Sequence, residues 1–175
     1  MGSGPVSIGV AVAVPEPYAT ELRTYRASFG DVQARAVPTH VTLVPPVTVD
    51  GDLVPVETHL SRVALRHRPF EMLLRGTGTF RPLSPVVFVA VALGIAECEL
   101  LAHDVRAGPL AVEPEFPYHP HVTIAHHLDD VALDKAFDTL ADYRCAFDVD
   151  AFVLFVHDGV ARWHERRVFE LGPAG

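Results

Sequence analysis

The chain has 175 residues, 49% of them hydrophobic, and its 22 acidic side chains outnumber the 14 basic ones, giving a formal net charge of −8. This size and composition allow the core of one compact domain or of two small lobes. The acidic excess argues against an extended nucleic-acid surface, because such surfaces neutralise phosphates with Lys and Arg. A small anionic ligand in a locally positive pocket is still compatible with this charge.

The sequence also indicates the cellular compartment in which the protein is expected. No apolar run approaches the roughly 18 residues of a membrane helix, and no basic segment precedes the apolar run from Ile8 to Val14. We therefore expect neither a membrane span nor a signal peptide. Cys98 and Cys145 are too few for a disulfide framework. Buried free thiols are typical of a reducing cytoplasm, so we expect a cytoplasmic protein. We also expect it to be a monomer.

Hydrophobic periodicity and turn residues predict the elements of the first half. In chain order they are a buried strand at residues 6–14, a helix from Pro15 to about Phe29, a strand around His40 that Pro45 and Pro46 stop, a helix at residues 55–66, and a strand from Phe70 to about Phe80. The inward face of the 55–66 helix is predicted to consist of Val56, Leu60, Val63 and Ala64.

The second half is predicted to repeat this order. It contains a buried strand from Pro85 to Ala92, a helix at residues 95–107, a strand around His121, a helix at residues 129–142, a strand from Cys145 to Val156, a turn at Asp158 and Gly159, and a closing strand from Ala161 to Leu171. The inward face of the 129–142 helix is predicted to consist of Val131, Leu133, Ala136, Phe137 and Leu140.

The order strand, helix, strand, helix, strand thus occurs twice. Val10 precedes His40 by 30 residues, and the matching Val89 precedes His121 by 32. Repetition of a whole unit implies two similar lobes related by an approximate two-fold axis. We therefore expect residues 1–175 to form a single domain of two repeats, at about 6–80 and 86–157, with a closing strand at 161–171.

One motif lies at the same place in both repeats. His40-Val41-Thr42-Leu43 and His121-Val122-Thr123-Ile124 both read His-Val-Thr-aliphatic. In a strand, residues i and i+2 share one face and are about 7 Å apart, so each copy places His beside Thr and buries the aliphatic residues on the other face. A single strand histidine is usually structural, but two copies in register predict that both converge on one phosphate.

These residues carry a resemblance to a known family. The stretch from His40 to Pro46, the strand pair 70–80 and 86–92, and the stretch from Tyr118 to Ala125 are similar to the 2H phosphoesterase superfamily, particularly its 2′-5′ RNA ligase and cyclic phosphodiesterase-like group. The resemblance implies an α+β fold with two lobes, in which two antiparallel sheets line a central cleft and helices pack outside. It also implies metal-independent chemistry on 2′,3′-cyclic or 2′-5′-linked phosphoesters.

The residue types fit that chemistry on independent grounds. Opening a cyclic phosphodiester needs a base that activates water and an acid that protonates the departing ribose oxygen, and His40 and His121 could supply both. The hydroxyls of Thr42 and Thr123 would donate to the non-bridging phosphate oxygens. This scheme needs no cofactor and no metal. Which histidine is the acid is left open.

Further candidates surround this core. Members of the resembled family often carry Arg or Lys where this chain has His126, so phosphate binding there would be pH-dependent or absent. An aromatic ring at Tyr118 or Phe80 could stack on a base, although aromatics beside strands are more often core. Arg81 is a candidate anion contact. The same holds for Arg35, and His119 could line the same face as His121.

We expect hydrolysis of a small cyclic-phosphate nucleotide or of a phosphoester at an RNA terminus. RNA 2′-5′ ligation is an alternative reaction, and a non-catalytic module that binds a nucleotide or phosphate is an alternative class. A zinc site is a third possibility, with nitrogen ligands drawn from His119, His121, His40 and His127. It would leave the two threonines without a role.

Overall fold

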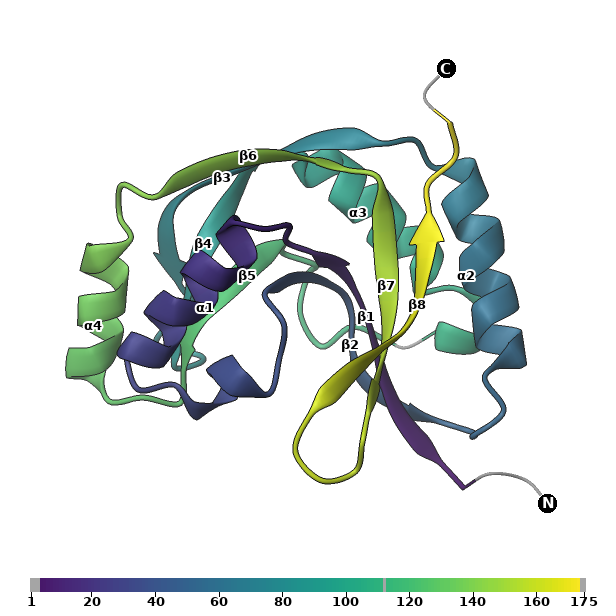
Figure 1. Ribbon diagram of the computed structural model, residues 1–175, viewed down its shortest axis with the longest axis horizontal. Helices are drawn as coiled ribbons and strands as arrows, with labels where there is room; N and C mark the ends of the chain where they lie inside the picture. The colour runs from purple at the N-terminus through teal and green to yellow at the C-terminus, as the bar shows by residue number, and fades with distance from the viewer. Residues whose placement is uncertain (1–3, 112, 174–175) are drawn as a thin grey trace.

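The described part of the chain, residues 4–111 and 113–173 of a computed structural model, forms two antiparallel sheets of four strands each (Figure 1). Sheet A has the strand order β2-β1-β7-β8, and its strands are β1 (Val6–Ala13), β2 (His40–Val49), β7 (Ala151–His157) and β8 (Trp163–Glu170). Sheet B has the order β5-β4-β3-β6, and its strands are β3 (Phe70–Thr79), β4 (Val86–Leu93), β5 (His121–His126) and β6 (Arg144–Val149).

Helices cover both sheets. On sheet B, α1 (Tyr18–Ser28) and α4 (Asp130–Thr139) contact the strands, and on sheet A, α2 (Val54–Arg66) and α3 (Ile95–Val105) do so (Figure 1). Two short 3-10 helices are η1 (Val32–Arg35) and η2 (Gly108–Leu110). The predicted α+β architecture with two antiparallel sheets is confirmed. In the described ranges, no helix has the length and apolar character needed to cross a membrane.

Side-chain alternation fixes which face of each sheet is buried. In β2, Val41 and Leu43 have no exposed surface, whereas His40 and Thr42 are half-buried on the opposite face. The second copy in β5 behaves in the same way, with Val122 and Ile124 in the core. This confirms the predicted orientation of both His-Val-Thr copies. The predicted inward face of α2 is also confirmed, since all four of its residues are buried.

β2 continues through Pro45 and Pro46 as far as Val49, so the prediction that these prolines stop the strand is wrong. β2 is the edge strand of sheet A, where only alternate residues point their N–H toward the neighbouring strand, and neither proline is among the residues of β2 paired with β1. The pairing is irregular at this point, where the register shifts on β1 between Ile8 and Val10.

The segment from Cys145 to Val156 is two strands rather than the single strand predicted. β6 pairs with β3 in sheet B, whereas β7 pairs with β1 in sheet A. The change of sheet occurs at Asp150, whose carbonyl accepts a hydrogen bond from the backbone N–H of Leu171 at 2.8 Å. In the main core, odd positions such as Val149 are buried before the break and even positions such as Phe152 after it. This shift in parity is the sequence signal of the break.

The elements of the two halves occupy corresponding places. Each sheet has a His-Val-Thr strand at one edge and receives its third strand from the other half of the chain, β7 in sheet A and β3 in sheet B. The helices also cross over, since α1 contacts β5 and α3 contacts β2. Two copies of one unit around an approximate two-fold axis would produce this exchange. It supports the proposed duplication within one domain, which remains a prediction.

Val131 was predicted to face inward on α4, but it is 79% exposed. It precedes Leu133 by two residues, which is a rotation of about 200° on a helix, so the two side chains lie on opposite faces. Leu133 is fully buried. We expect Leu133→Ala to lower the free energy of unfolding by about 2–5 kcal/mol. The matched change Val131→Ala should shift it by less than about 0.5 kcal/mol, and urea unfolding of both variants tests this.

Candidate active site

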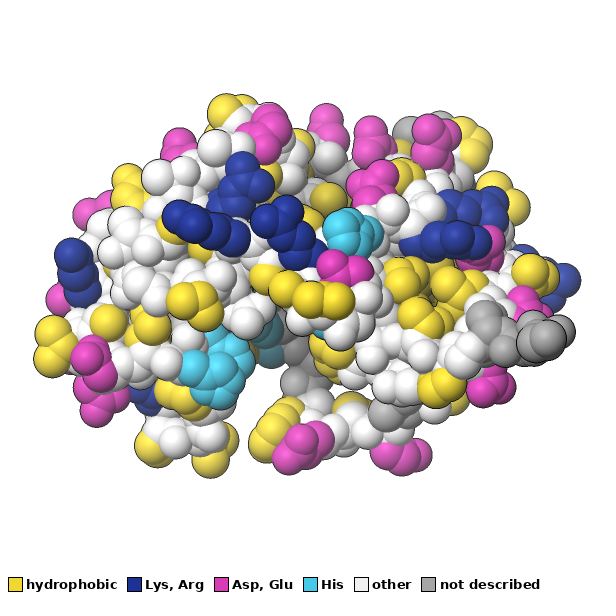
Figure 2. Space-filling view, turned by 60° about the horizontal axis from the view of Figure 1, so that its bottom comes forward, with side chains coloured by type: hydrophobic (Ala, Val, Ile, Leu, Met, Phe, Trp, Pro, Cys, Tyr) yellow, Lys and Arg dark blue, Asp and Glu magenta, His cyan; other side chains and the backbone are white. Residues whose placement is uncertain are grey.

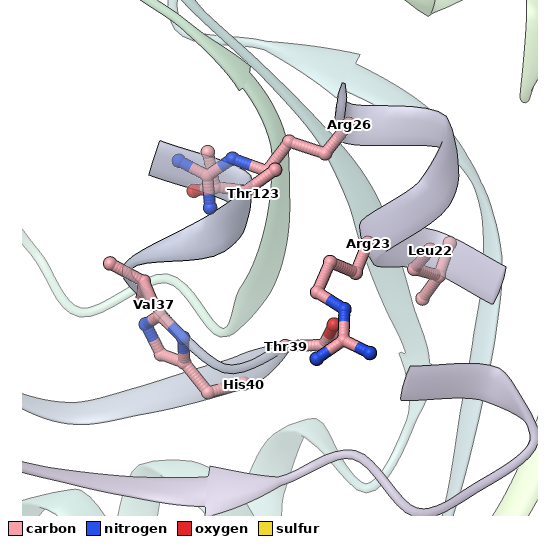
Figure 3. A pocket seen from close by; sticks show the side chains of 8 residues that line it. Leu22, Arg23, Arg26, Val37, Thr39, His40 and Thr123 are labelled. Atoms are coloured by element: carbon pink, nitrogen blue, oxygen red, sulfur yellow. The ribbon is translucent and has the colours of Figure 1, made fainter. Parts of the chain in front are cut away.

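The two His-Val-Thr strands lie against each other where sheets A and B meet, because their edge strands β2 and β5 are in contact. A pocket at this junction is lined by His40 from β2 and by Thr123 from β5, so it draws on both copies (Figure 3). Figure 2 shows this region as a hollow in the molecular surface, with histidine side chains along its wall. The structure thus brings the two predicted motifs to one place.

Both histidines are oriented by the same hydrogen bond. Nδ1 of His40 lies 2.6 Å from the carbonyl oxygen of Pro38, and Nδ1 of His121 lies 2.6 Å from the carbonyl oxygen of His119. A carbonyl only accepts, so each Nδ1 carries the proton and donates it. In the neutral ring, Nε2 then keeps its lone pair and is the nitrogen available for chemistry. Two imidazoles with the same fixed tautomer suit proton transfer.

Burial favours the neutral form of both imidazoles in the unliganded protein. It lowers the pKa of His40 below the ordinary value, and the positive charge of Arg26 acts in the same direction. Burial, together with the neighbouring His119 and His40, lowers the pKa of His121 to about 4. Because His40 acts electrostatically on His121, a charge on one ring disfavours a charge on the other.

The hydroxyls of Thr42 and Thr123 have no hydrogen-bond partner among residues 4–111 and 113–173. By contrast, Thr39 donates to the carbonyl of Ala19 at 2.7 Å, and Thr77 donates to the carbonyl of Phe137 at 2.9 Å. Both site threonines are only half-buried, so their hydroxyls can reach a ligand. They are therefore free to donate to an oxyanion.

Arg26 is a site residue that the sequence reasoning missed. It is 9% exposed, and it lines the same pocket as His40 and Thr123 (Figure 3). Its Nε donates to Asp31 Oδ2 at 2.8 Å, which leaves its two terminal nitrogens without a hydrogen-bond partner in the described part of the chain. A guanidinium held in this way presents two donors and a fixed positive charge to an anion.

Asp31, 4% exposed, holds Arg26 in position and also binds the second motif strand. Its Oδ2 accepts the Arg26 bond and a second bond from the backbone N–H of His126 at 3.0 Å, while Oδ1 accepts from the backbone N–H of Gln33 at 2.9 Å. The carboxylate therefore connects α1, η1 and the end of β5. It thereby fixes the Arg26 guanidinium relative to Thr123, which lies on β5.

Arg106 occupies the corresponding place in the second half, just after α3. Its Nε donates to the carbonyl of Leu43 at 2.7 Å, and its guanidinium lies 5.0 Å from the centre of the Tyr118 ring. The Tyr118 hydroxyl donates to the carbonyl of Thr42 at 2.7 Å. Arg106 thus binds the motif strand of the first half directly, whereas Arg26 is linked to the motif strand of the second half through Asp31. Comparing Arg26 with Arg106 across the repeat is the sequence signal that could have identified Arg26.

Comparison with known proteins agrees with this geometry. Residues 14–161 match the family described as the 2′-5′ RNA ligase superfamily. The chain belongs to this superfamily, the 2H phosphoesterases. A Bacillus thuringiensis (strain Al Hakam) protein, whose name classes it provisionally as a phosphoesterase, is 27% identical over 139 residues, covering 78% of this chain and 80% of that protein.

Solved structures show the same fold. The protein TT0787 of Thermus thermophilus matches with a TM-score of 0.67 at 22% identity, over 97% of this chain and 100% of that chain. The complex of Escherichia coli LigT with 3′-AMP matches with a TM-score of 0.61 at 20% identity, over 96% of this chain and 99% of that chain. The 2H phosphoesterase fold therefore extends over nearly the whole chain.

Several aromatic side chains lie close to His121 in this 2H phosphoesterase. The ring centre of Phe80 lies 5.0 Å from that of His121 and 4.6 Å from that of Phe88. His119 is exposed, and its ring centre lies 5.5 Å from that of Phe80. Phe80, a predicted stacking residue, is therefore next to the motif. The other predicted stacking residue, Tyr118, has Arg106 over its ring.

The remaining candidates differ in their surroundings. Arg81 forms ion pairs with Asp130 at 3.4 Å and with Asp134 at 2.9 Å, so its charge is already compensated. Arg35 is exposed at the end of η1.

His126, where the family resemblance led us to look for a cation, stacks on His127 with ring centres 3.6 Å apart. Burial and the neighbouring His127 lower the pKa of His126, so it is not a strong cation. Arg26 supplies the fixed charge close by. Among the described residues, no three His, Cys, Asp or Glu side chains gather into a group that could hold a metal ion.

Proposed function

We propose that this chain is a metal-independent phosphodiesterase that opens a 2′,3′-cyclic phosphate, or a related phosphoester of a small nucleotide or an RNA terminus. The observation that carries the proposal is the matched pair of imidazoles, each with Nδ1 hydrogen-bonded to a carbonyl and Nε2 left available, on two motif strands that contact each other. Acid–base catalysis of this reaction needs two such groups. The family of the chain supports phosphoester chemistry in general.

In the proposed reaction the phosphate lies between His40 and His121. Nε2 of one neutral histidine takes a proton from water as the water oxygen bonds to phosphorus. The bond between phosphorus and one ribose oxygen breaks, and the other histidine, protonated at Nε2, gives its proton to that oxygen. A nucleoside monophosphate is the product. Attack and departure on opposite sides of phosphorus require two separate proton-transfer groups, one on each strand.

Three further side chains are proposed to bind the charge of the phosphate. Thr42 and Thr123 would donate hydrogen bonds to the non-bridging oxygens, since both hydroxyls lack other partners in the ranges described. Arg26 would donate from its terminal nitrogens, since its Nε is already used by Asp31. Donors fixed before the reaction stabilise the charge as it develops, with no cost of reorganisation.

The proposal is tested by incubating the protein with 2′,3′-cyclic AMP in excess chelator and identifying the products. Hydrolysis to a single monophosphate isomer is expected, because the acid lies on one side of the phosphorus only. LigT has been crystallised with 3′-AMP, with ATP and with phosphate, which makes small nucleotides a sensible first screen. Absence of turnover, with retained nucleotide binding, would favour the non-catalytic module.

Ligation is a second candidate because the family takes its description from 2′-5′ RNA ligase. In the same site, a ribose 5′-hydroxyl would replace water as the nucleophile that attacks the cyclic phosphate. Supplying a second oligonucleotide with a 5′-hydroxyl end separates the reactions, since ligation gives a longer product.

The buried free thiols of Cys98 and Cys145 support the expected cytoplasmic setting.

The lowered pKa values of His40 and His121 predict the pH dependence. The active protein carries one proton on the histidine pair, and kcat/KM reports the pKa values of the free enzyme. Because both pKa values lie below the ordinary 6.5, the maximum of kcat/KM is expected below pH 6.5, with a fall on both sides. The kcat profile should lie at higher pH, since bound phosphate favours imidazolium. A maximum of kcat/KM above pH 7 would contradict this.

A further inference from the structure

A second aromatic surface lies on the face of sheet A that carries His40 and Thr42. Cross-strand partners point to the same side of a sheet, and Ala11 is paired with both Thr42 and Val153. Ala11 and Val153 therefore share the face of Thr42. Together with Phe155 they form a small buried cluster, and the partly buried side chain of Trp163 packs on top of it.

The indole of Trp163 reaches toward the motif strand. Its Cζ3 lies 3.7 Å from the position that a Cβ on Gly9 would occupy, an ordinary van der Waals distance, so the ring packs close to β1. Gly9 is two residues from Ala11, the partner of Thr42. This places the ring edge about 7 Å along β1 and one strand spacing, about 4.8 Å, across from Thr42. The backbone N–H of Trp163 also donates to the carbonyl of Ala36, in the segment that leads to His40, at 3.1 Å.

Sheet B carries a matching surface beside Thr123. Phe88 is the cross-strand partner of both Thr123 and Gly78. Its ring lies directly over Gly78, since a Cβ there would come within 2.5 Å of the Phe88 ring. Phe80 packs against Phe88, with ring centres 4.6 Å apart.

The two surfaces are built in the same way. Gly9 is paired with Phe155 in sheet A, and Phe88 is paired with Gly78 in sheet B, so each face has one phenylalanine opposite one glycine. A further aromatic residue covers each pair, Trp163 in the first case and Phe80 in the second. Each motif threonine thus has an aromatic surface one or two strands away, on its own side of the junction.

We propose that Trp163 is a stacking surface for a second planar base, so that the preferred ligand is a dinucleoside monophosphate with its phosphate at the two histidines and one base on each sheet. The proposal rests on the proposed function, because it takes the phosphate position from it. A cyclic mononucleotide has one base and would use only the Phe80 side. Stacking tolerates any base because every base has a π face.

Trp163 is the single tryptophan of the chain, so its fluorescence reports directly on this surface. The experiment titrates His121→Ala, which keeps the substrate intact, with adenylyl-2′,5′-adenosine and with 2′,3′-cyclic AMP. The dinucleotide is expected to quench the fluorescence saturably, and the mononucleotide to bind with little quenching. Equal quenching by both ligands, or none by the dinucleotide at saturation measured by calorimetry, would overturn the proposal.

Substitutions separate stacking from a structural role. Trp163→Ala is expected to weaken dinucleotide binding roughly 5- to 150-fold and to leave mononucleotide binding unchanged. Trp163→Phe should restore most of the lost dinucleotide affinity, and Phe80→Ala should weaken the binding of both ligands.

An equal loss of affinity for both ligands in Trp163→Ala would contradict the proposal. If Trp163→Ala fails to fold, the fluorescence titration still tests the proposal, because that experiment keeps Trp163. Because these experiments measure binding without turnover, they can support the stacking role of Trp163 even if the protein does not hydrolyse the ligands.

Discussion

Replacing His40 or His121 with alanine is expected to lower kcat for hydrolysis of a 2′,3′-cyclic nucleotide by about 10²–10⁴-fold. Each change removes one proton transfer at phosphorus, while Arg26 and the two threonines still hold the phosphate. Nucleotide affinity should therefore change much less than kcat. Steady-state kinetics, with binding measured by calorimetry, separates the two quantities.

His103→Ala is the matched control. His103 is a surface histidine on α3 with an 85% exposed side chain, and its replacement should leave kcat unchanged. Each site variant should also lose one limb of the kcat/KM profile, because one of the two titrating groups is gone. If either variant keeps wild-type kcat and both limbs, the acid–base pair is refuted.

The two substitutions should not be additive. Once one histidine is missing, the other cannot complete the reaction, so the double variant should be about as slow as the slower single variant. Independent roles would instead multiply the two losses. This comparison asks whether the His-Val-Thr copies act as a pair, which measurements on each histidine alone leave undecided.

Asp31→Ala is expected to lower the free energy of unfolding by about 3–5 kcal/mol. The change leaves the buried Arg26 guanidinium without its partner and removes the acceptor of two backbone N–H groups, those of His126 and Gln33. A buried charge that loses its partner is costly because it remains out of water without compensation. Urea unfolding measures the loss directly.

Asp134→Ala is the control for this prediction. It removes an ion pair with Arg81 at 2.9 Å in which the Asp134 side chain is 66% exposed, and surface pairs contribute about 0–1 kcal/mol. Phosphate binding should also weaken in Asp31→Ala, because Arg26 is no longer held beside Thr123. Equal stability of the two variants would show that the Asp31 carboxylate has no structural role.

The sequence predicted those features that depend on local pattern. Alternation placed Val41 and Leu43 in the core and the histidine and threonine of the motif on the other face. Helical spacing identified the buried side of α2. The repeat of His-Val-Thr at His40 and His121 predicted that two distant strands meet, because a two-fold axis carries one copy onto the other. The roles of these residues remain predictions that the variants above will decide.

Features that depend on tertiary pairing were harder to predict. In the sequence, the change of sheet at Asp150 shows only as a switch of the buried side chains from odd to even positions. Because residues 151–156 are all apolar, the alternation that would reveal this switch is hidden. Arg26 looks like an ordinary helix arginine until its helix is seen against β5, the motif strand of the other half. Trp163 begins a polar strand, and only the cross-strand register places it near Thr42.

The most direct test compares wild type with the double variant His40→Ala and His121→Ala in hydrolysis of 2′,3′-cyclic AMP with excess chelator. We expect the wild type to be faster by more than about 10²-fold and to form one monophosphate isomer, while both proteins bind the nucleotide. Equal rates in the two proteins, with nucleotide bound to both, would contradict catalysis by this pair of histidines.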